Sequence, residues 1–312
     1  MTDLPPVPPV GLIGFGRWGA LLANELPKAG LELAAIAVKT EAHARELASA
    51  MPGIAVTTDC VTLINNQALA AVVVATPAQS HEVLVRAALL EGHDVFVEKP
   101  LSLSGPAARE LTELALEKKA ILFVGHIFIH HPAIVALETL IARGELGELQ
   151  AISACWTNIE ATPGDVSVIW NLGPHPLSII ALLCGSGAES LMAVRDGEEV
   201  AITIDHGDGL TSRTQLNWAA DVRQRRVKVI GSNATAVFDD ESKSLTIQAH
   251  NGIEQPVEFD RAAPLGVELR AFYEALSKRT ARGDGDFAVN VVTWLEAAET
   301  SQQTAGHSIS LA

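Results

Sequence analysis

Cysteine is scarce in this sequence, with only Cys60, Cys155 and Cys184 among 312 residues. Their number is odd and their spacing matches no zinc site, so reduced thiols in a cytosolic protein are favoured over disulfides or a metal site. No apolar run approaches the ~18 residues that a membrane-spanning helix needs. The N-terminal residues 1–9 are rich in proline but lack the cationic and apolar stretches of a signal peptide. We therefore expect a soluble, cytoplasmic protein without a membrane partner.

Positive charge is also scarce. The chain has 22 lysines and arginines against 37 aspartates and glutamates, which gives a formal net charge of −15. So acidic a surface disfavours nucleic acid and anionic membranes as partners. It does not exclude a bound phosphate, because backbone N–H groups can hold an anion on an acidic protein.

The first 125 residues alternate short apolar runs with helical patterns, as expected for one of two domains in a chain of this length. Continuous apolar strands joined by helices predict a parallel sheet covered on both faces, in a doubly wound Rossmann domain over residues 1–125. The expected strands are 10–13, 33–38, 71–75, 95–97 and 121–124, and the expected helices are 18–29, 41–50, 80–90 and 104–119.

The pattern changes after Gly125. Several runs alternate polar with apolar residues, which predicts a half-exposed, mostly antiparallel sheet in an α+β domain over residues 126–312. The last two helices of this segment are free to pack back on the first domain. Expected strands are 149–156, 190–194, 200–204, 211–218, 225–230, 234–239 and 244–249, and expected helices are 132–143, 176–183, 267–278 and 289–303.

Three glycines form a dinucleotide-binding fingerprint after the first strand and at the start of the first helix. Gly14 permits a tight turn, Gly16 removes the Cβ that would block a pyrophosphate, and Gly19 lets the helix pack close to the strand. The pyrophosphate would lie at the positive end of the helix dipole. The whole candidate segment is Gly14, Phe15, Gly16, Arg17, Trp18 and Gly19. For Trp18, packing is favoured over stacking on the cofactor.

The adenosine end lacks the expected acid. NAD sites usually place Asp or Glu about 20 residues after the fingerprint, but here Lys39 and Thr40 occupy that region. Both can bond a ribose 2′-phosphate, so NADP is favoured over NAD. In the alternative, Lys39 is a solvated loop residue and Glu41 binds the ribose.

Further motifs closely resemble the glucose-fructose oxidoreductase / inositol dehydrogenase (Gfo/Idh/MocA) family, over nearly the whole chain. The motifs are Ala75-Thr76-Pro77 with His81, Val97-Glu98-Lys99-Pro100-Leu101, Gly125-His126, His131-Pro132-Ala133, Gly144-Glu145-Leu146-Gly147, Trp170-Asn171-Leu172-Gly173-Pro174-His175-Pro176, and the segments 269–272 and 294–298. The resemblance implies hydride transfer between NAD(P) and a carbinol or ketone of a sugar or sugar nucleotide. It also implies a large open C-terminal sheet that forms a homodimer or homotetramer contact. The stretch 166–173 is most similar to members that act on nucleotide-linked amino sugars.

Lys99 follows a strand end, where Rossmann folds bind ligand. By resemblance it lies between nicotinamide and substrate, donates a hydrogen bond to the reacting oxygen and joins the proton relay. Pro100 shapes this turn, and we predict a cis bond between the two residues. Glu98 either orients Lys99 and contacts the cofactor or is a solvated carboxylate.

His175 matches the catalytic histidine of the family and can exchange the hydroxyl proton near neutral pH. Together Lys99 and His175 would make a proton-transfer pair between the two domains. Asn171 departs from the family, which often has Asp four residues before the histidine. Asn keeps the hydrogen-bonding shape but cannot stabilise an imidazolium by charge. Either Lys99 and His175 suffice, which we favour, or the enzyme is weak or altered.

The remaining site candidates lie at other strand ends. Thr76, Pro77 and His81 are expected to line the nicotinamide ribose, although His81 is equally compatible with solvent exposure. We expect His126 to face the substrate. The neighbouring His130 and His131 are assigned to packing or to the rim, and no carboxylate or cysteine accompanies these histidines at metal-ligand spacing, so no metal is predicted.

Two other functions remain open. One is reduction of a non-sugar substrate, as in biliverdin reductases and dihydrodiol dehydrogenases; retention of both Lys99 and His175 favours the sugar substrate. The other is an NAD(P)-binding sensor or scaffold with little turnover, which only Asn171 favours.

Overall fold

A computed structural model describes residues 7–159, 166–185, 187–281 and 285–311. The contacts among its residues divide the chain into two compact units. The first unit comprises residues 1–125 and 263–289, and the second comprises residues 126–262 and 290–312. The chain thus passes from one unit to the other after Gly125, and a later segment belongs with the first unit.

The first unit is built on a parallel sheet with the strand order β3-β2-β1-β4-β5-β6. This order is that of a doubly wound Rossmann fold, so the predicted fold class of this part is confirmed. The strands are β1 (Pro9–Ile13), β2 (Glu32–Ala37), β3 (Ala55–Thr57), β4 (Ala71–Val74), β5 (Asp94–Glu98) and β6 (Leu122–Gly125). The helices are α1 (Arg17–Glu25), η1 (Pro27–Ala29), α2 (Glu41–Ala50), α3 (Cys60–Ile64), η2 (Ala78–Ser80), α4 (His81–Leu90), α5 (Gly105–Lys118) and α9 (Pro264–Lys278).

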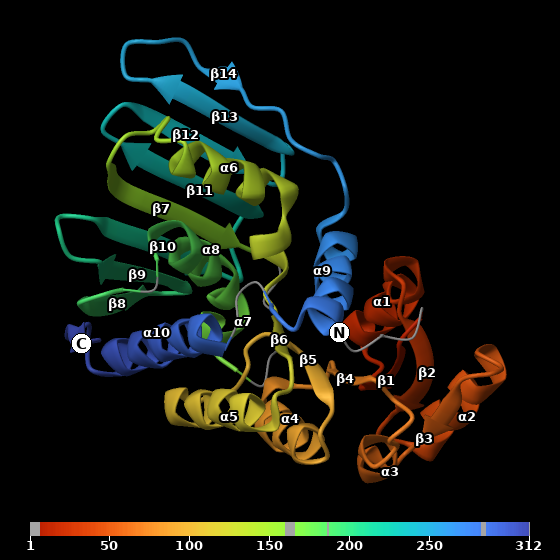
Figure 1. Cartoon of the computed structure of the whole chain (residues 1–312). Helices are drawn as coiled ribbons and strands as arrows, with labels where there is room; N and C mark the ends of the chain where they lie inside the picture. The colour runs from red at the N-terminus through yellow and green to blue at the C-terminus, as the bar shows by residue number, and fades with distance from the viewer. Residues whose placement is uncertain (1–6, 160–165, 186, 282–284, 312) are drawn as a thin grey trace. The chain divides into compact units, whose positions relative to one another are not determined.

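Local chemistry sets the ends of these helices. Thr40 caps α2 by accepting a hydrogen bond from the backbone N–H of His43, and Ser104 caps α5 in the same way. Helices α4 and α5 lie side by side (Figure 1). Strand β3 and helix α3 were not predicted, because three-residue strands and five-residue helices are too short to show a period.

Helix α9 completes the core of the first unit. Its buried residues Leu269, Phe272, Ala275 and Leu276 join the apolar cluster formed by the sheet and α1. The helix lies beside α1 (Figure 1).

The second unit carries a sheet in which nine strands are found among the described residues, in the order β14-β13-β12-β11-β7-β10-β9-β8-β15. All neighbours are antiparallel except β7 and β10, which confirms the predicted mostly antiparallel sheet. The strands are β7 (Leu149–Thr157), β8 (Ser190–Asp196), β9 (Glu199–Asp205), β10 (Thr211–Asn217), β11 (Gln224–Gly231), β12 (Ala234–Asp239), β13 (Ser244–Ala249), β14 (Gln255–Pro256) and β15 (Ile309–Ser310).

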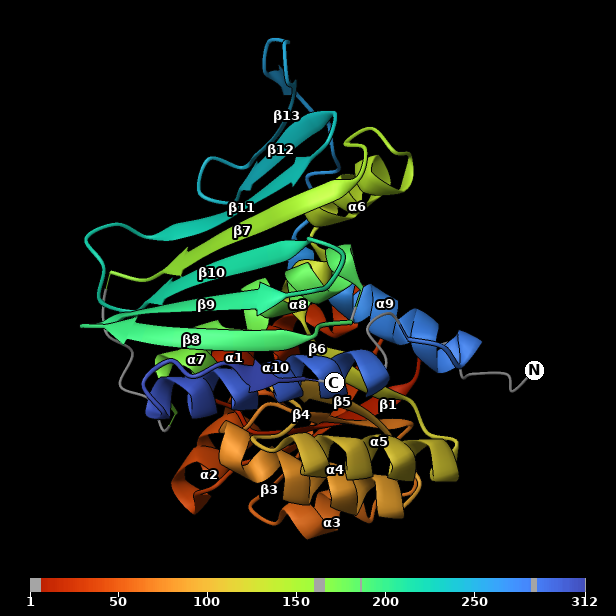
Figure 2. The ribbon, with the colours of Figure 1, turned by 90° about the vertical axis from the view of Figure 1, so that its left-hand side faces the viewer.

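The helices of the second unit bury one face of this sheet. Helices α6 and α8 lie against the same face (Figure 2), and the strands β9 and β11 alternate buried and more exposed residues accordingly. The helical elements are η3 (Ile127–His130), α6 (Pro132–Ala142), α7 (Val168–Leu172), α8 (Pro174–Cys184) and α10 (Gly285–Gln303), the last shared between the units. No helix in the described ranges is both long and apolar enough to cross a membrane.

Candidate functional site

The glycine turn between β1 and α1 has the geometry of a phosphate cradle. A Cβ on Gly14 would lie 2.5 Å from the carbonyl oxygen of Ala75, and one on Gly19 would lie 2.3 Å from that of Gly14. Gly14 also has a positive φ of 96°, which favours glycine. At Gly16 an added Cβ meets none of the described atoms within 4 Å. Two glycines therefore allow close backbone packing, while the third leaves open space at the N-terminus of α1, which fits a dinucleotide pyrophosphate.

The other residues of the turn have different environments. Arg17 is exposed, while Phe15 is half-buried and meets the ring of His43 edge-on at 6.0 Å between centroids. Trp18 is half-buried, and its indole N–H donates a hydrogen bond to Oε1 of Glu98. Trp18 thereby connects α1 to the end of β5, a contact that its sequence position did not reveal.

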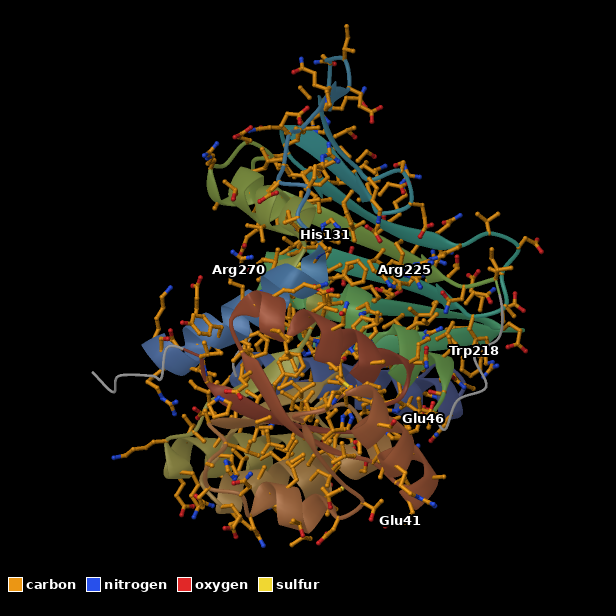
Figure 3. The ribbon with its side chains drawn as sticks, turned by 90° about the vertical axis from the view of Figure 1, so that its right-hand side faces the viewer. Glu41, Glu46, His131, Trp218, Arg225 and Arg270 are labelled. Atoms are coloured by element: carbon orange, nitrogen blue, oxygen red, sulfur yellow. The ribbon has the colours of Figure 1, made fainter. Side chains whose placement is uncertain are left out.

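The candidate adenosine end lies just beyond β2. Lys39 and Thr40 are exposed, and the hydroxyl of Thr40 is engaged as the cap of α2. Glu41 is exposed in the first turn of α2 (Figure 3). Its carboxylate accepts a hydrogen bond of 2.7 Å from the hydroxyl of Thr58. An exposed ammonium at the loop is compatible with a 2′-phosphate, and an engaged Glu41 is less available to a ribose hydroxyl.

His81 connects two of the predicted site loops. It is 1% exposed, so the alternative of a solvent-exposed histidine is wrong. Its Nδ1 lies 2.7 Å from the carbonyl oxygen of Pro100, and its Nε2 lies 2.8 Å from that of Thr76. Burial lowers the pKa of His81, and the nearby charge of Lys99 acts in the same direction. The ring thus joins the loop after β4 to the turn after β5.

The turn after β5 carries Glu98, Lys99 and Pro100. The Lys99–Pro100 bond is cis, as the sequence predicted, and Lys99 is half-buried. Glu98 is only 8% exposed, so the alternative of a solvated carboxylate is wrong. Burial raises the pKa of Glu98 to about 7, against the opposing effects of the Trp18 hydrogen bond and the Lys99 charge.

A second buried acid belongs to the same unit. Glu268 on α9 is fully buried, and burial together with the charge of Glu98 raises its pKa well above the ordinary value. Glu268 is not evident as a site residue from the sequence pattern. A glutamate one position before an apolar helical face resembles a boundary residue, and only the packing of α9 shows its burial.

His175 in the second unit lies in an aromatic setting. It occupies the first turn of α8, between Pro174 and Pro176, and is half-buried. Its ring meets Phe128 edge-on at 5.3 Å and is stacked near Trp156 at 6.4 Å between centroids. These aromatic neighbours come from η3 and β7, more than 15 residues away in the sequence, so no local sequence pattern indicates them.

The ring of Trp156 lies near a cationic side chain of the sheet. The guanidinium of Arg225 on β11 lies 5.5 Å from the centroid of the Trp156 ring and donates a 2.6 Å hydrogen bond to the carbonyl of Thr157. Burial lowers the pKa of Arg225 to about 10, with the charge of Arg223 adding to the effect.

Asn171 lies on α7, a short helix that was not predicted. It is half-buried, and its backbone N–H donates to the carbonyl of Ser167. The preceding Trp170 is buried and donates its indole N–H to the carboxylate of Glu299 on α10. Trp170 therefore anchors the helix that presents Asn171 four residues before His175.

The three neighbouring histidines are all buried. His131 caps α6 through Nδ1, which accepts from the backbone N–H of Ala133, and its Nε2 lies 3.2 Å from Oδ1 of Asp240. His131 is thus a packing residue. His126 is 2% exposed, and its expected contact with substrate stays a prediction. In the part of the chain that the structure describes, no three His, Cys, Asp or Glu side chains are grouped to hold a metal ion.

Comparisons with known proteins give a consistent picture. Residues 9–126 match the oxidoreductase family with an NAD-binding Rossmann fold, GFO_IDH_MocA. The chain is 28% identical over 163 residues to dTDP-3,4-didehydro-2,6-dideoxy-alpha-D-glucose 3-reductase of Streptomyces violaceoruber, covering 50% of this chain and 47% of the relative. It is 24% identical over 269 residues to inositol 2-dehydrogenase of Rhizobium meliloti, covering 79% and 80%. The chain thus spans about half the length of the sugar-nucleotide reductases that it matches.

Solved structures resemble the fold over the full chain. UDP-N-acetylglucosamine 3-dehydrogenase from Acidithiobacillus ferrooxidans is 22% identical, with a TM-score of 0.86 over 96% of this chain and 98% of that one. An inositol dehydrogenase homologue from Azotobacter vinelandii, complexed with NADH and myo-inositol, is 21% identical, with a TM-score of 0.86 over 97% of each chain. At these identities the likeness shows the fold.

Proposed function

We propose that the chain, whose residues 9–126 match the GFO_IDH_MocA family of oxidoreductases with an NAD-binding Rossmann fold, transfers a hydride between NAD(P) and a carbinol or ketone of a sugar or sugar nucleotide. The observation that carries this proposal is the glycine cradle, where Gly14 and Gly19 permit tight packing and Gly16 leaves room for a pyrophosphate. The relatives named for dTDP-sugars and inositol support the substrate class.

The cofactor is held by residues of the first unit in this proposal. The backbone around Gly16 binds the pyrophosphate, Lys39 and Thr40 bind a 2′-phosphate, and the loop with Thr76 and Pro77 borders the ribose. When bound, the nicotinamide ring supplies the acceptor or donor of hydride. We favour NADP over NAD, since Lys39 is exposed and Glu41 already accepts a bond from Thr58.

Protons are handled by Lys99 and His175 in this proposal. In the oxidative direction the substrate hydroxyl loses its proton to the imidazole of His175 as the hydride leaves the carbon that carries this hydroxyl. Lys99 donates a hydrogen bond to the reacting oxygen. Asn171 contributes an amide where many relatives have a carboxylate, and His126 contacts substrate. His81 keeps the Lys99 turn in place through the carbonyl of Pro100.

The proposal is tested with a substrate panel of UDP-N-acetylglucosamine, dTDP-hexoses and myo-inositol, followed at the NAD(P)H absorbance band. Lys99→Ala and His175→Ala are each expected to lower kcat by about 10²- to 10⁴-fold. Lys28→Ala and His250→Ala, at exposed positions, serve as matched controls that retain activity. Turnover that is unchanged in both site variants would contradict the assigned roles.

A second candidate is an NAD(P)-binding sensor with little turnover. Asn171 is the observation that favours it, since an amide cannot stabilise an imidazolium by charge. Tight NADPH binding without turnover on any member of the panel would support the sensor and overturn the enzyme.

A further inference from the structure

Glu268 is an ionisable side chain in an environment that does not stabilise a negative charge. It is 0% exposed, and both carboxyl oxygens are enclosed without a hydrogen-bond partner among the described residues. A buried, unpaired carboxylate is strongly disfavoured, and such groups hold a proton instead. Burial accordingly raises the pKa of Glu268 well above its ordinary value of 4.5.

Helix α9 runs antiparallel to β5, which brings Glu268 towards the end of that strand. Arg279, at the end of α9, donates hydrogen bonds of 2.6 and 2.9 Å to the carboxylate of Asp94, the first residue of β5. Phe272 meets Phe96 in the middle of β5, with 5.4 Å between ring centroids. Glu268 then falls at the level of Glu98, the last residue of β5.

The dimensions agree with this alignment. From Arg279 to Glu268 the helix rises about 16 Å, and from Asp94 to Glu98 the strand rises about 13 Å. Glu268 lies one helical turn before Phe272 and so shares its face. Glu98 lies two residues after Phe96 and so shares its side of the sheet. A Cβ on Gly125 would lie 3.0 Å from the Phe96 ring and 3.2 Å from Oε1 of Glu98, which places the Glu98 carboxylate beside that ring.

Glu98 is better able to carry a negative charge than Glu268. Its carboxylate accepts hydrogen bonds from the indole of Trp18 and from the backbone N–H of Lys99, and the ammonium of Lys99 adds a favourable charge. For Glu268, by contrast, the negative charge of Glu98 has the same sign and disfavours ionisation.

We propose that Glu98 and Glu268 form a buried pair of interacting carboxyl groups that holds one proton, with Glu268 as the protonated member and a positioning residue for Lys99. Two carboxyl groups in one low-dielectric site do not both ionise. With one proton between them, the pair and the ammonium of Lys99 carry no net charge. The positioning role towards Lys99 rests on the proposed function, whereas the existence of the carboxyl pair does not depend on it.

The surrounding elements supply few other charges. His81 at the start of α4 is near Lys99; burial and the charge of Lys99 favour its neutral ring, against the opposing effect of the carbonyls of Pro100 and Thr76, and its pKa is lowered on balance. On η1, Lys28 pairs at the surface with Glu25 of α1, 2.7 Å away. The titration of the pair is therefore governed by Glu98, Glu268 and Lys99.

The direct test is infrared difference spectroscopy of the full chain with isotope-labelled glutamate, titrated through neutral pH. The wild type is expected to show a protonated-carboxyl band that persists above pH 7, where Glu98 ionises, and this persisting band should be lost in Glu268→Gln, a near-isosteric change. In Glu98→Gln the remaining acid should lose its proton at a pH lower by about one unit or more, because the repelling charge is gone. A purely structural Glu268 would not shift in this way.

Glu274→Gln is the matched control, since Glu274 is on the same helix, exposed and paired with Lys278. It should leave the band and its titration unchanged. No band that depends on Glu268 near neutral pH, or an identical titration in Glu98→Gln, would overturn the pair. These outcomes do not depend on turnover, so they are separable from failure of the proposed function. In an active enzyme, Glu98→Gln should also move the basic limb of the pH–rate profile to lower pH, because the negative charge that stabilises the ammonium of Lys99 is removed.

Discussion

The two units build their candidate sites from different kinds of groups. In the first unit, main-chain groups dominate: a glycine turn, the N-terminus of α1, and the carbonyls that hold His81. In the second unit, side chains dominate: His175 is surrounded by Phe128 and Trp156. A site made from the backbone depends on local conformation, whereas a site made from side chains depends on the packing of distant elements.

The largest expected effect separates folding from binding within the first unit. Gly14→Ala places a Cβ against the Ala75 carbonyl and strains a positive φ, so we expect a loss of about 1–3 kcal/mol of stability and NAD(P)H binding weakened by at least ~100-fold. Gly16→Ala meets open space and should keep the parent Tm while weakening binding by about 10-fold or more. Thermal unfolding and fluorescence titration measure the two quantities. Equal loss of Tm in both variants would mean that Gly16 serves folding alone.

This difference explains how much the sequence could predict. Gly14 and Gly19 imply the phosphate turn because only glycine satisfies their local geometry, and the sequence located both. The parallel, doubly wound sheet was predicted from continuous apolar runs joined by helices. Trp156 and Glu268 were not identified, because an alternating strand and an amphipathic helix give no sign of which ring or acid they enclose. Their roles arise only when elements far apart in the sequence pack together.

The two units should also respond to pH in opposite directions. Burial raises the pKa of Glu98 from 4.5 to about 7, so its contribution to stability is present below about pH 4.5 and is lost as pH rises through 7. Burial alone would also raise the pKa of Asp240, but its hydrogen bonds with His131 and Lys243 prevail and lower it from 3.8 to about 2. The contribution of Asp240 is therefore present above pH 3.8 and lost as pH falls through 2.

Denaturant unfolding across this pH range measures both responses. For Glu98 the unfolding free energy should fall by at most ~1.4 kcal/mol per pH unit between about pH 4.5 and 7, and Glu98→Gln should remove that share of the slope while the share of Glu268 remains. Asp240→Asn should instead change the acid limb and leave the slope near neutrality. A slope that is as steep in Glu98→Gln as in the parent would assign the whole of it to other groups.

Asn171→Asp tests whether charge can be added to the aromatic surroundings of His175. A carboxylate near the imidazole favours its protonated form, so the acidic limb of the pH–rate profile in the oxidative direction should move to higher pH by about one unit. Asn158→Asp, also on the second unit but bonded to Arg225, is the comparison variant. An unchanged limb in Asn171→Asp would show that residue 171 does not communicate with the catalytic proton.

The smallest expected effect concerns the exposed end of the first unit. Lys39→Asp replaces a cation that can attract a 2′-phosphate by an anion that repels it, so the ratio of NADPH to NADH affinity should fall by about 10-fold. The change should be smaller at high salt, because Lys39 is exposed and its charge is screened. Lys28→Asp, another exposed lysine of the first unit, should leave the ratio unchanged. Titration of both dinucleotides at two salt concentrations measures this ratio. If the parent already prefers NADH, the role of Lys39 is contradicted and Glu41 is the residue that binds the ribose.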